Sequence, residues 1–398
     1  MRAGLVLLAL AFTTPAAADG PGEPDVALAD LQGASSAGPE AADLLRAPDR
    51  LRVATFNAAL TRRGPGLLLR DILSGADPQI AAVAAIIARV DPDILLITAI
   101  DHDGGLVALS AFADLLEEAG AAYPHRFAFA SNAGLQTGLD LDGDGRSGTP
   151  DDAHGYGPFA GAKAMGLLSR LPVDAAAARD FSQFLWADLP GALYPGTPPP
   201  SAQAQAVQRL SSTGHWDVPV ILPEDAGRLH LLAFYASPPV FGPVAGRNLR
   251  RNHDEVRFWS LLLDGALPMA PPEGPFVLLG DSNLDPFDGD GMHAAMADLL
   301  AHPALQDPEP RSAGGAAAAT WAADAGHRGD PALDTTLWQR AEGPGNLRVD
   351  YVLPSAGLAV LDAGVFWPAP GTPEAALLGP DGVAASRHRL VWVDLALP

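Results

Sequence analysis

The chain has 398 residues, of which 48% are hydrophobic, and it carries a formal net charge of −22 and no cysteine. This length can bury a large core, and the absence of cysteine excludes disulfides and thiolate metal sites, so any metal is expected on oxygen or histidine ligands. The negative charge repels a polyanion, so long nucleic acid is disfavoured as a partner.

The N-terminus has the layout of a cleaved secretory signal. Arg2 is followed by an apolar run that ends at Phe12 and by small residues up to Ala18. The run is too short to cross a bilayer, and no later segment has the ~18 uninterrupted apolar residues of a membrane helix. We therefore expect an exported protein, periplasmic or extracellular, with a signal peptide at residues 1–18, a Pro-, Gly- and Ala-rich tail at 19–49 and one domain at 50–398.

The domain is expected to alternate buried strands with amphipathic helices. Apolar runs predict strands at 51–57, 93–98, 164–169, 229–235, 276–280, 348–353 and 390–395, and helical periodicity predicts helices at 79–90, 106–119 and 253–263. Asn252 followed by Glu255 is typical of an N-terminal capping box, which would start the last helix at residue 253.

Residues 140–151 match a twelve-residue calcium loop, with Asp140, Asp142 and Asp144 at positions 1, 3 and 5 and Asp151 at position 12. Aspartate at position 12 is shorter than the usual glutamate, and no helix pair flanks the loop. A plain acidic turn is therefore the alternative to a structural calcium site.

Two groups near the predicted last helix are candidates for substrate contact. Arg247, Arg250 and Arg251, with His253, form the main basic cluster of an acidic chain, and guanidinium groups suit phosphate. Pairing with Asp254 and Glu255 within the helix is the alternative. His215 lies beside a tryptophan, so it either contacts a ligand or packs against an indole ring.

The strand at 276–280 runs directly into Asp281, and Asn283 follows two residues later. That spacing places both side chains on one face of an extended segment. A carboxylate and an amide at a strand end suit general-base and phosphate-orienting work, although an ordinary Asp/Asn/Gly turn has the same composition.

Four motif positions occur in the order used by the endonuclease/exonuclease/phosphatase superfamily: Asn57, the Gly-Asp-x-Asn motif at 280–283, Asp350 and His388. Over residues 50–396 the chain resembles an exported bacterial branch of this superfamily, most clearly in segments 138–145, 184–192, 210–219 and 247–255. The resemblance implies a DNase I-like α/β fold, a four-layer sandwich of two packed mixed β-sheets flanked by helices. It also implies hydrolysis of a phosphoester assisted by Mg or Mn.

The resemblance also implies a role for each matching residue. Asp281 is the general base, and Asn57 and Asn283 orient the phosphate. Asp350 holds His388, which stabilises the charge that develops on the phosphorus oxygens.

The sequence departs from the superfamily pattern at several positions. Ala99 stands where a metal-binding glutamate is usual, and Arg387 replaces the aspartate of the final Ser-Asp-His motif. Tyr235 replaces a histidine and is a candidate substrate contact. Asp101, two residues after Ala99, is a candidate displaced metal ligand, with the start of a loop as the alternative.

Lys163 is a second unexpected cation in a segment near the predicted site. One hypothesis is that Lys163 and Arg387 take the place of the divalent ion and neutralise Asp281 and Asp350. Two functions stay open on the sequence. The protein is either a phosphoesterase for small phosphoesters with altered or impaired catalysis, or an inactive family member that binds a ligand or has a structural role. The oligomeric state is not specified by these patterns.

Overall fold

The computed structural model describes residues 49–194, 201–242, 244, 246–322, 326–338 and 343–397, all within one structural unit. The expected signal peptide and all but the last residue of the expected tail lie outside these residues. The strands are β1 (Arg50–Asn57), β2 (Ile94–Ile100), β3 (His125–Phe127), β4 (Ala164–Ser169), β5 (Arg179–Asp180), β6 (Gly214–Ile221), β7 (Arg228–Tyr235), β8 (Phe276–Asp281), β9 (Asp350–Pro354), β10 (Val360–Val365) and β11 (Val391–Ala396). The helices are α1 (Leu67–Ser74), α2 (Pro78–Val90), α3 (Val107–Glu118), α4 (Ala202–Val207), α5 (Arg247–Leu263), α6 (Ala294–Leu300) and α7 (Ala313–Ala322).

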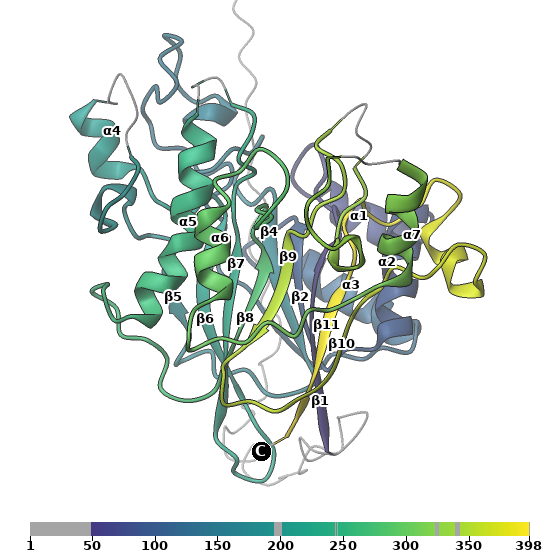
Figure 1. The fold of residues 1–398 in the computed structure, drawn as a ribbon. Helices are drawn as coiled ribbons and strands as arrows, with labels where there is room; N and C mark the ends of the chain where they lie inside the picture. The colour runs from purple at the N-terminus through teal and green to yellow at the C-terminus, as the bar shows by residue number, and fades with distance from the viewer. Residues whose placement is uncertain are drawn as a thin grey trace, which may run out of the picture. The chain divides into compact units, whose positions relative to one another are not determined.

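The strands form two mixed sheets that pack face to face. One has the order β10-β11-β1-β2-β4-β3 and the other the order β5-β6-β7-β8-β9. Strands β1 and β2 of the first sheet contact β8 of the second, and β1 and β11 contact β9. Helices α2 and α3 lie outside the first sheet, and α5 and α6 lie outside the second (Figure 1). This arrangement confirms the predicted α/β sandwich of the DNase I type.

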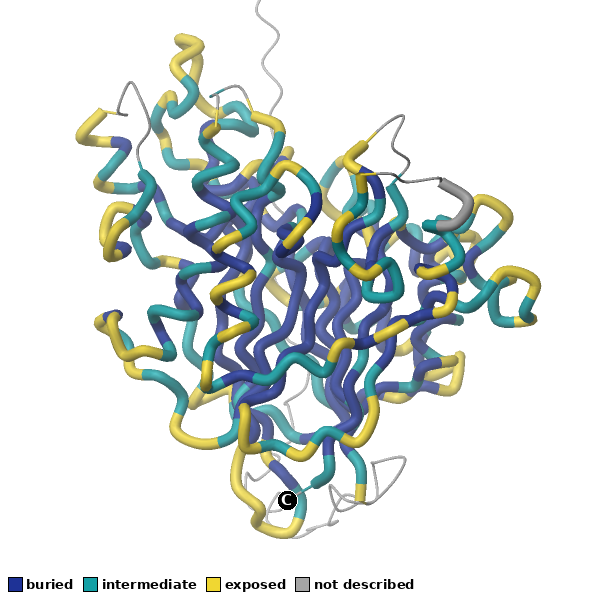
Figure 2. Tube along the Cα trace, in the orientation of Figure 1, coloured by how far each residue is buried: buried dark blue, intermediate teal, exposed yellow. Residues whose placement is uncertain are grey.

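The central strands are buried on both faces because sheets cover one side and helices the other (Figure 2). Every residue of β2 is buried, which explains why this strand is a continuous apolar run instead of an alternating one. One apolar cluster fills the space between the sheets and beneath α2 and α3, and a second lies beneath α5 and α6. Each fully buried leucine, isoleucine or valine contributes ~1.5–3 kcal/mol to stability.

The expected capping box at Asn252 is wrong. Helix α5 begins at Arg247 after Gly246, which has the left-handed φ of 68°. Asn252 lies inside the helix, and its Nδ2 donates to the carbonyl oxygens of Ser237 and Ser282, each at 2.7 Å. The Asn-x-x-Glu pattern therefore serves contacts between α5 and the ends of β7 and β8.

The strand ends bring the polar motifs together. Strand β1 runs parallel to β2, and β7 runs parallel to β8. A hydrogen bond from Asn57 to Asp281 joins the last residues of β1 and β8, so the carboxyl ends of these four strands lie at one edge. Strands β11 and β9 are antiparallel neighbours of β1 and β8, so their starts lie at that same end. Asn57, Tyr235 and Asp281 therefore meet Asp350 and the segment before β11 at one edge of the sandwich.

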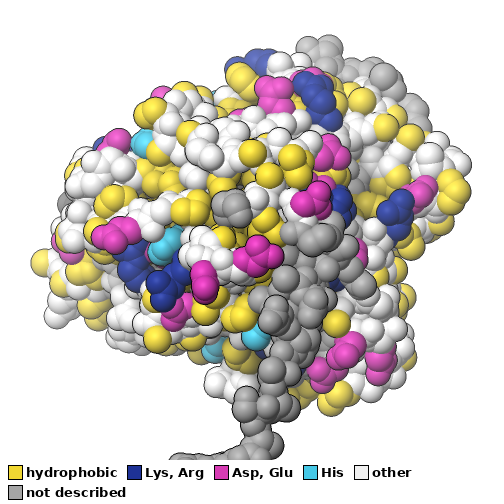
Figure 3. Space-filling model, turned by 90° about the horizontal axis from the view of Figure 1, so that it is seen from below, with side chains coloured by type: hydrophobic (Ala, Val, Ile, Leu, Met, Phe, Trp, Pro, Cys, Tyr) yellow, Lys and Arg dark blue, Asp and Glu magenta, His cyan; other side chains and the backbone are white. Residues whose placement is uncertain are grey.

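Two further observations concern the charges on the surface and the length of the helices. Seen from below, acidic and basic side chains are interspersed with apolar ones on the described part of this face (Figure 3). Within the described ranges, no single helix is long and apolar enough to cross a membrane.

Candidate active site

Asp281, at the end of β8, is the most constrained carboxylate of the site. The side chain is fully buried, its Oδ2 accepts a hydrogen bond from Asn57 Nδ2 at 2.8 Å, and its Oδ1 accepts one from the Asn283 backbone N–H at 2.8 Å. Burial, and then the negative charge of Asp350, raise the pKa of Asp281. This raised pKa moves the carboxylate towards the range of a general base that works near neutral pH.

His388 precedes β11 and is held by a second buried carboxylate. Its Nδ1 lies 2.9 Å from Asp350 Oδ2 and 3.8 Å from Asp281 Oδ2. Thr335 Oγ1 donates to the same Asp350 oxygen at 2.9 Å, while Asp350 Oδ1 is buried without a hydrogen-bond partner. Burial lowers the pKa of His388, but the carboxylates of Asp350 and Asp281 outweigh burial and the net shift is upward.

Asp281, Asp350 and His388 each place one ligand atom so that all three lie within 4.8 Å of one another. Two buried carboxylates repel one another at this distance, and a bound cation would relieve that repulsion. The partnerless Asp350 Oδ1 is an additional oxygen donor at the same place. The carboxylate oxygens of Asp281 and Asp350 fit Mg²⁺ or Mn²⁺. The donor set can therefore hold a divalent ion.

Ala99, which stands at the position of the usual glutamate, lies at a break in the pairing of β2 with β4. Ala99 has a φ of 56° at an irregularity where the register between β2 and β4 shifts, and it is 7% exposed. The neighbouring Asp101 does not join the group of Asp281. Its Oδ2 accepts a hydrogen bond from the Arg62 backbone N–H at 2.9 Å, and burial raises its pKa to about 6. The structure thus places no substitute carboxylate from Asp101 beside Asp281.

Arg387 does not replace the ion, contrary to the hypothesis from the sequence. The side chain is exposed, its Nη1 lies 3.4 Å from the Leu337 carbonyl oxygen, and no ion pair joins it to Asp281 or Asp350, both of which are described. The sequence motif places Arg387 next to His388, but successive residues of an extended segment point to opposite sides. The charge of Arg387 therefore faces solvent.

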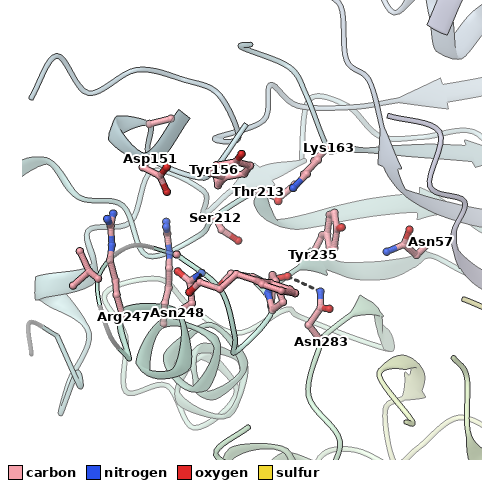
Figure 4. A pocket seen from close by; sticks show the side chains of 18 of the residues that line it. Asn57, Asp151, Tyr156, Lys163, Ser212, Thr213, Tyr235, Arg247, Asn248 and Asn283 are labelled. Carbon is pink, nitrogen blue, oxygen red and sulfur yellow. Dashed lines mark hydrogen bonds between the residues drawn. The ribbon is translucent and has the colours of Figure 1, made fainter. Parts of the chain in front are cut away.

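A cavity of about 600 Å³ opens beside the carboxylates. Asn57, Asn283, Tyr235 and His388 all line it, and Asn57, Tyr235 and Asn283 lie towards one end (Figure 4). Asn283 Nδ2 donates to the Ala236 carbonyl oxygen at 2.9 Å, so its amide is held by the backbone. Burial raises the pKa of Tyr235, opposed by its hydrogen bond to Asn57.

The rest of the wall combines Arg247, a member of the predicted basic cluster, with residues that the sequence did not single out. Lys163, which the sequence marked only as an unexpected cation, lines the cavity with its Nζ 4.9 Å from the centre of the Tyr156 ring. Ser212, Arg247 and Asn248 lie farther from Asn57 (Figure 4). Except for Arg247 and Asn248, at the start of α5, these side chains come from loops and strand edges, where periodicity gives no signal.

The structure places the three predicted substrate contacts Arg250, Arg251 and His215 in different environments. Arg251 lines the cavity, but its guanidinium is buried, donates to backbone carbonyl oxygens and stacks near Trp186. Arg250 is not among the residues that line the cavity. His215 is wrong as a substrate contact, because it is 1% exposed and stacks on Trp259 inside the core. The histidine packs on an indole ring, as the alternative expected, but the ring is that of Trp259 and not that of the neighbouring tryptophan.

The predicted calcium loop is partly assembled. Ligand oxygens of Asp140, Asp142 and Asp144 lie within 4.8 Å of one another and are exposed or half-buried. Asp151 lines the cavity instead. The next residue, Asp152, is the buried anchor of the loop and accepts hydrogen bonds from the backbone N–H groups of residues 141 and 149. Calcium at this loop stays a prediction.

Comparison with known proteins agrees with the geometry. The model of the endonuclease/exonuclease/phosphatase family matches residues 54–388. Among solved structures, an endonuclease/exonuclease/phosphatase from Beutenbergia cavernae DSM 12333 has a TM-score of 0.50 and 19% identity, over 88% of this chain and 72% of that chain. A family protein from Leptotrichia buccalis C-1013-b has a TM-score of 0.46 and 13% identity, over 87% and 99% of the two chains. Sphingomyelinase C from Streptomyces griseocarneus has a TM-score of 0.44 and 18% identity, over 87% and 99%.

At these identities the likeness to solved structures concerns the fold. None of the curated proteins compared with the chain matches it significantly. The family model, in contrast, spans nearly the whole described domain, from within β1 to His388. The chain therefore belongs to the endonuclease/exonuclease/phosphatase family.

Proposed function

We propose that the protein hydrolyses small phosphoesters with the help of Mg²⁺ or Mn²⁺. The observation that carries the proposal is the position of Asp281, whose two oxygens are fixed by Asn57 and Asn283 beside the His388–Asp350 pair. All of these groups except Asp350 and Asp281 line the same cavity, and those two lie directly behind its wall. A phosphate in the cavity would thus meet the imidazole and the amide groups directly, with the carboxylate of the base next to them behind the wall.

Each residue has a role that follows from its contacts. Asp281 takes the proton of the attacking water, because its carboxylate is held in place and its raised pKa favours proton uptake. Asp350 accepts a hydrogen bond from Nδ1–H of His388, and the net upward shift in the pKa of His388 favours an imidazolium with a second proton on Nε2. This Nε2–H donates to the phosphate oxygens or the leaving group. A divalent ion held by the carboxylates of Asp281 and Asp350 would supply Lewis-acid polarisation of the phosphate.

The alternative function is an inactive family member that only binds a ligand. Ala99 favours it, because the missing carboxylate weakens the hold on a metal. We also propose that the protein is exported, which N-terminal sequencing of the secreted chain would test.

Removing metal is expected to abolish turnover of bis(4-nitrophenyl) phosphate by the purified protein, and adding Mg²⁺ or Mn²⁺ is expected to restore it. The measurement is the release of 4-nitrophenolate with a chelator and after each metal is added back. Plasmid DNA serves as the competing substrate, and its slower cleavage is expected from the charge of −22. Absence of turnover with every metal would favour the inactive alternative.

Ala99→Glu is expected to lower the metal concentration for half-maximal activity by at least ~10-fold, since it restores the metal-binding glutamate of the superfamily pattern at this position. Ala99 already has a left-handed φ of 56°, so glutamate adds little backbone strain relative to alanine. Ala99→Gln has the same length without the charge and is the matched control. If both variants retain the wild-type metal dependence, position 99 does not face the metal.

A further inference from the structure

The end of the cavity farthest from Asn57 is formed by the start of α5 (Figure 4). The helix begins at Arg247, and its N-cap, Gly246, supplies no side-chain hydrogen bond to the first turn. No acidic residue lies in that turn. Exposed N–H groups and the helix dipole favour an anion at such a place.

Arg247 adds a full positive charge to this helix start. One guanidinium nitrogen, Nη2, donates to Gln208 Oε1 at 2.8 Å, and within the described residues no carboxylate lies at ion-pair distance. Asp151 is in the same wall, and its charge and those of Asp142 and Asp152 act on Arg247 from beyond ion-pair distance. Among the described residues the guanidinium of Arg247 therefore has no carboxylate in direct contact.

Ser212 supplies a second, independent sign of a ligand. Its residue is 7% exposed, and its Oγ is buried without a hydrogen-bond partner although the residue lines the cavity. A buried hydroxyl without a partner costs ~1–3 kcal/mol, which a ligand acceptor would recover. The wall here is rigid, because a Cβ on Gly155 would come within 1.7 Å of the Ser212 carbonyl oxygen.

We propose that Arg247, Ser212 and the first turn of α5 bind a second oxyanion of the substrate. The preferred substrate class is then a small phosphoester that carries another anionic group, a carboxylate or a phosphate, at the end opposite to the scissile bond. This inference rests on the proposed function for the position of the scissile group. Phe241 and Val244 line the cavity as well and suit a short aliphatic link between the two anions, and Lys163 adds positive charge along the wall.

Non-hydrolysable probes test the second site without turnover. A homologous series of ω-carboxyalkylphosphonates is compared with alkylphosphonates of equal length by calorimetry. At one chain length the carboxylate is expected to improve the Kd by about 10- to 100-fold, the range for hydrogen bonds to a charged group. If no length in the series shows a gain, the proposal is overturned.

Substitutions test which residues produce the improvement in Kd that the carboxylate gives. Arg247→Gln is expected to remove it without changing the Kd for the alkylphosphonate, and Ser212→Ala to reduce it by ~3- to 10-fold without loss of thermal stability. Arg257→Gln is the control, because it removes an equal charge from the same helix at a side chain that donates to the Pro190 carbonyl oxygen, away from the cavity. A gain that survives Arg247→Gln contradicts the proposal.

Turnover separates this inference from the proposed function. The 4-nitrophenyl diesters with a propyl and a 2-carboxyethyl group form the matched pair of substrates. If neither is hydrolysed while the carboxylate gain in binding depends on Arg247, the second site stands and the proposed hydrolysis fails. If both are hydrolysed with equal KM, and binding shows no gain, hydrolysis stands and the second site fails.

Discussion

Replacing Asp281 by asparagine is expected to lower kcat/KM for a phosphodiester by ~10³-fold while the protein stays folded, because a positioned general base contributes that order of rate. Asparagine has the shape of aspartate but takes no proton from water. The measurement is turnover at saturating metal. Asp298→Asn, at an exposed position on α6, is the matched control and is expected to leave the rate unchanged. A variant that keeps a tenth of the activity would contradict the role of Asp281 as base.

Thermal unfolding of the same variant in a chelator gives a second result. The pKa of Asp281 is raised in the folded protein by burial and by Asp350, so the ionised carboxylate destabilises the fold as pH rises above the unfolded pKa. Asparagine removes that charge, so at neutral and alkaline pH the variant is expected to melt at the wild-type temperature or above it. A large drop in melting temperature would instead show that the carboxylate is needed for the fold.

Glu255→Ala is expected to lower the free energy of unfolding by ~3–5 kcal/mol, because it leaves buried donors without their charged acceptor. Glu255 is fully buried in α5. Its Oε1 accepts the Ser212 backbone N–H at 2.5 Å, and its Oε2 accepts the backbone N–H and the Oγ of Ser237, each at 2.7 Å. Burial lowers the pKa of Arg251 to about 10, and Glu255 opposes that shift.

Urea unfolding of Glu255→Ala measures this loss, and Glu118→Ala is the control, since Glu118 is exposed at the end of α3. The control is expected to change stability by no more than ~0.5 kcal/mol. Because Ser212 and Ser237 both line the cavity, loss of Glu255 is also expected to weaken ligand binding. A loss of less than ~1 kcal/mol would mean that the freed donors find water.

The fold could be predicted from the sequence where burial leaves a periodic or continuous apolar signal. The runs that became β1, β2, β7 and β8 lie between layers and were found at nearly their observed bounds. Short β3 and β5 were not found, because two or three residues carry too little pattern. Asn252 was misassigned because a capping box and a side chain that bridges to strand ends share the same local spacing.

Some residues of the candidate site could be predicted from the sequence and others could not. Asn57, Asp281 and Asp350 lie at the ends of predictable strands, so order along the chain was enough to bring them together. Arg247 belongs to a basic cluster visible in the sequence, but it lines the same cavity as Ser212 only through packing of α5 and a loop against the sheet, which no local pattern encodes. His215 shows the same limit, because its ring stacks on Trp259, a residue distant in the sequence.

Gly280 sets a spacing that no side chain of the site controls. Its φ is 143°, and a Cβ there would lie 1.9 Å from the Phe234 carbonyl oxygen, so the main chains of β7 and β8 are in direct contact. In the register of this pair Tyr235 lies opposite Asp281. A single methyl group at residue 280 would push the strands apart and separate hydroxyl from carboxylate without altering any charge. Substitutions in the side chains that line the cavity can therefore change which ligand binds. The distance between the main chains of β7 and β8 stays fixed, because it depends on a glycine that takes no part in the reaction.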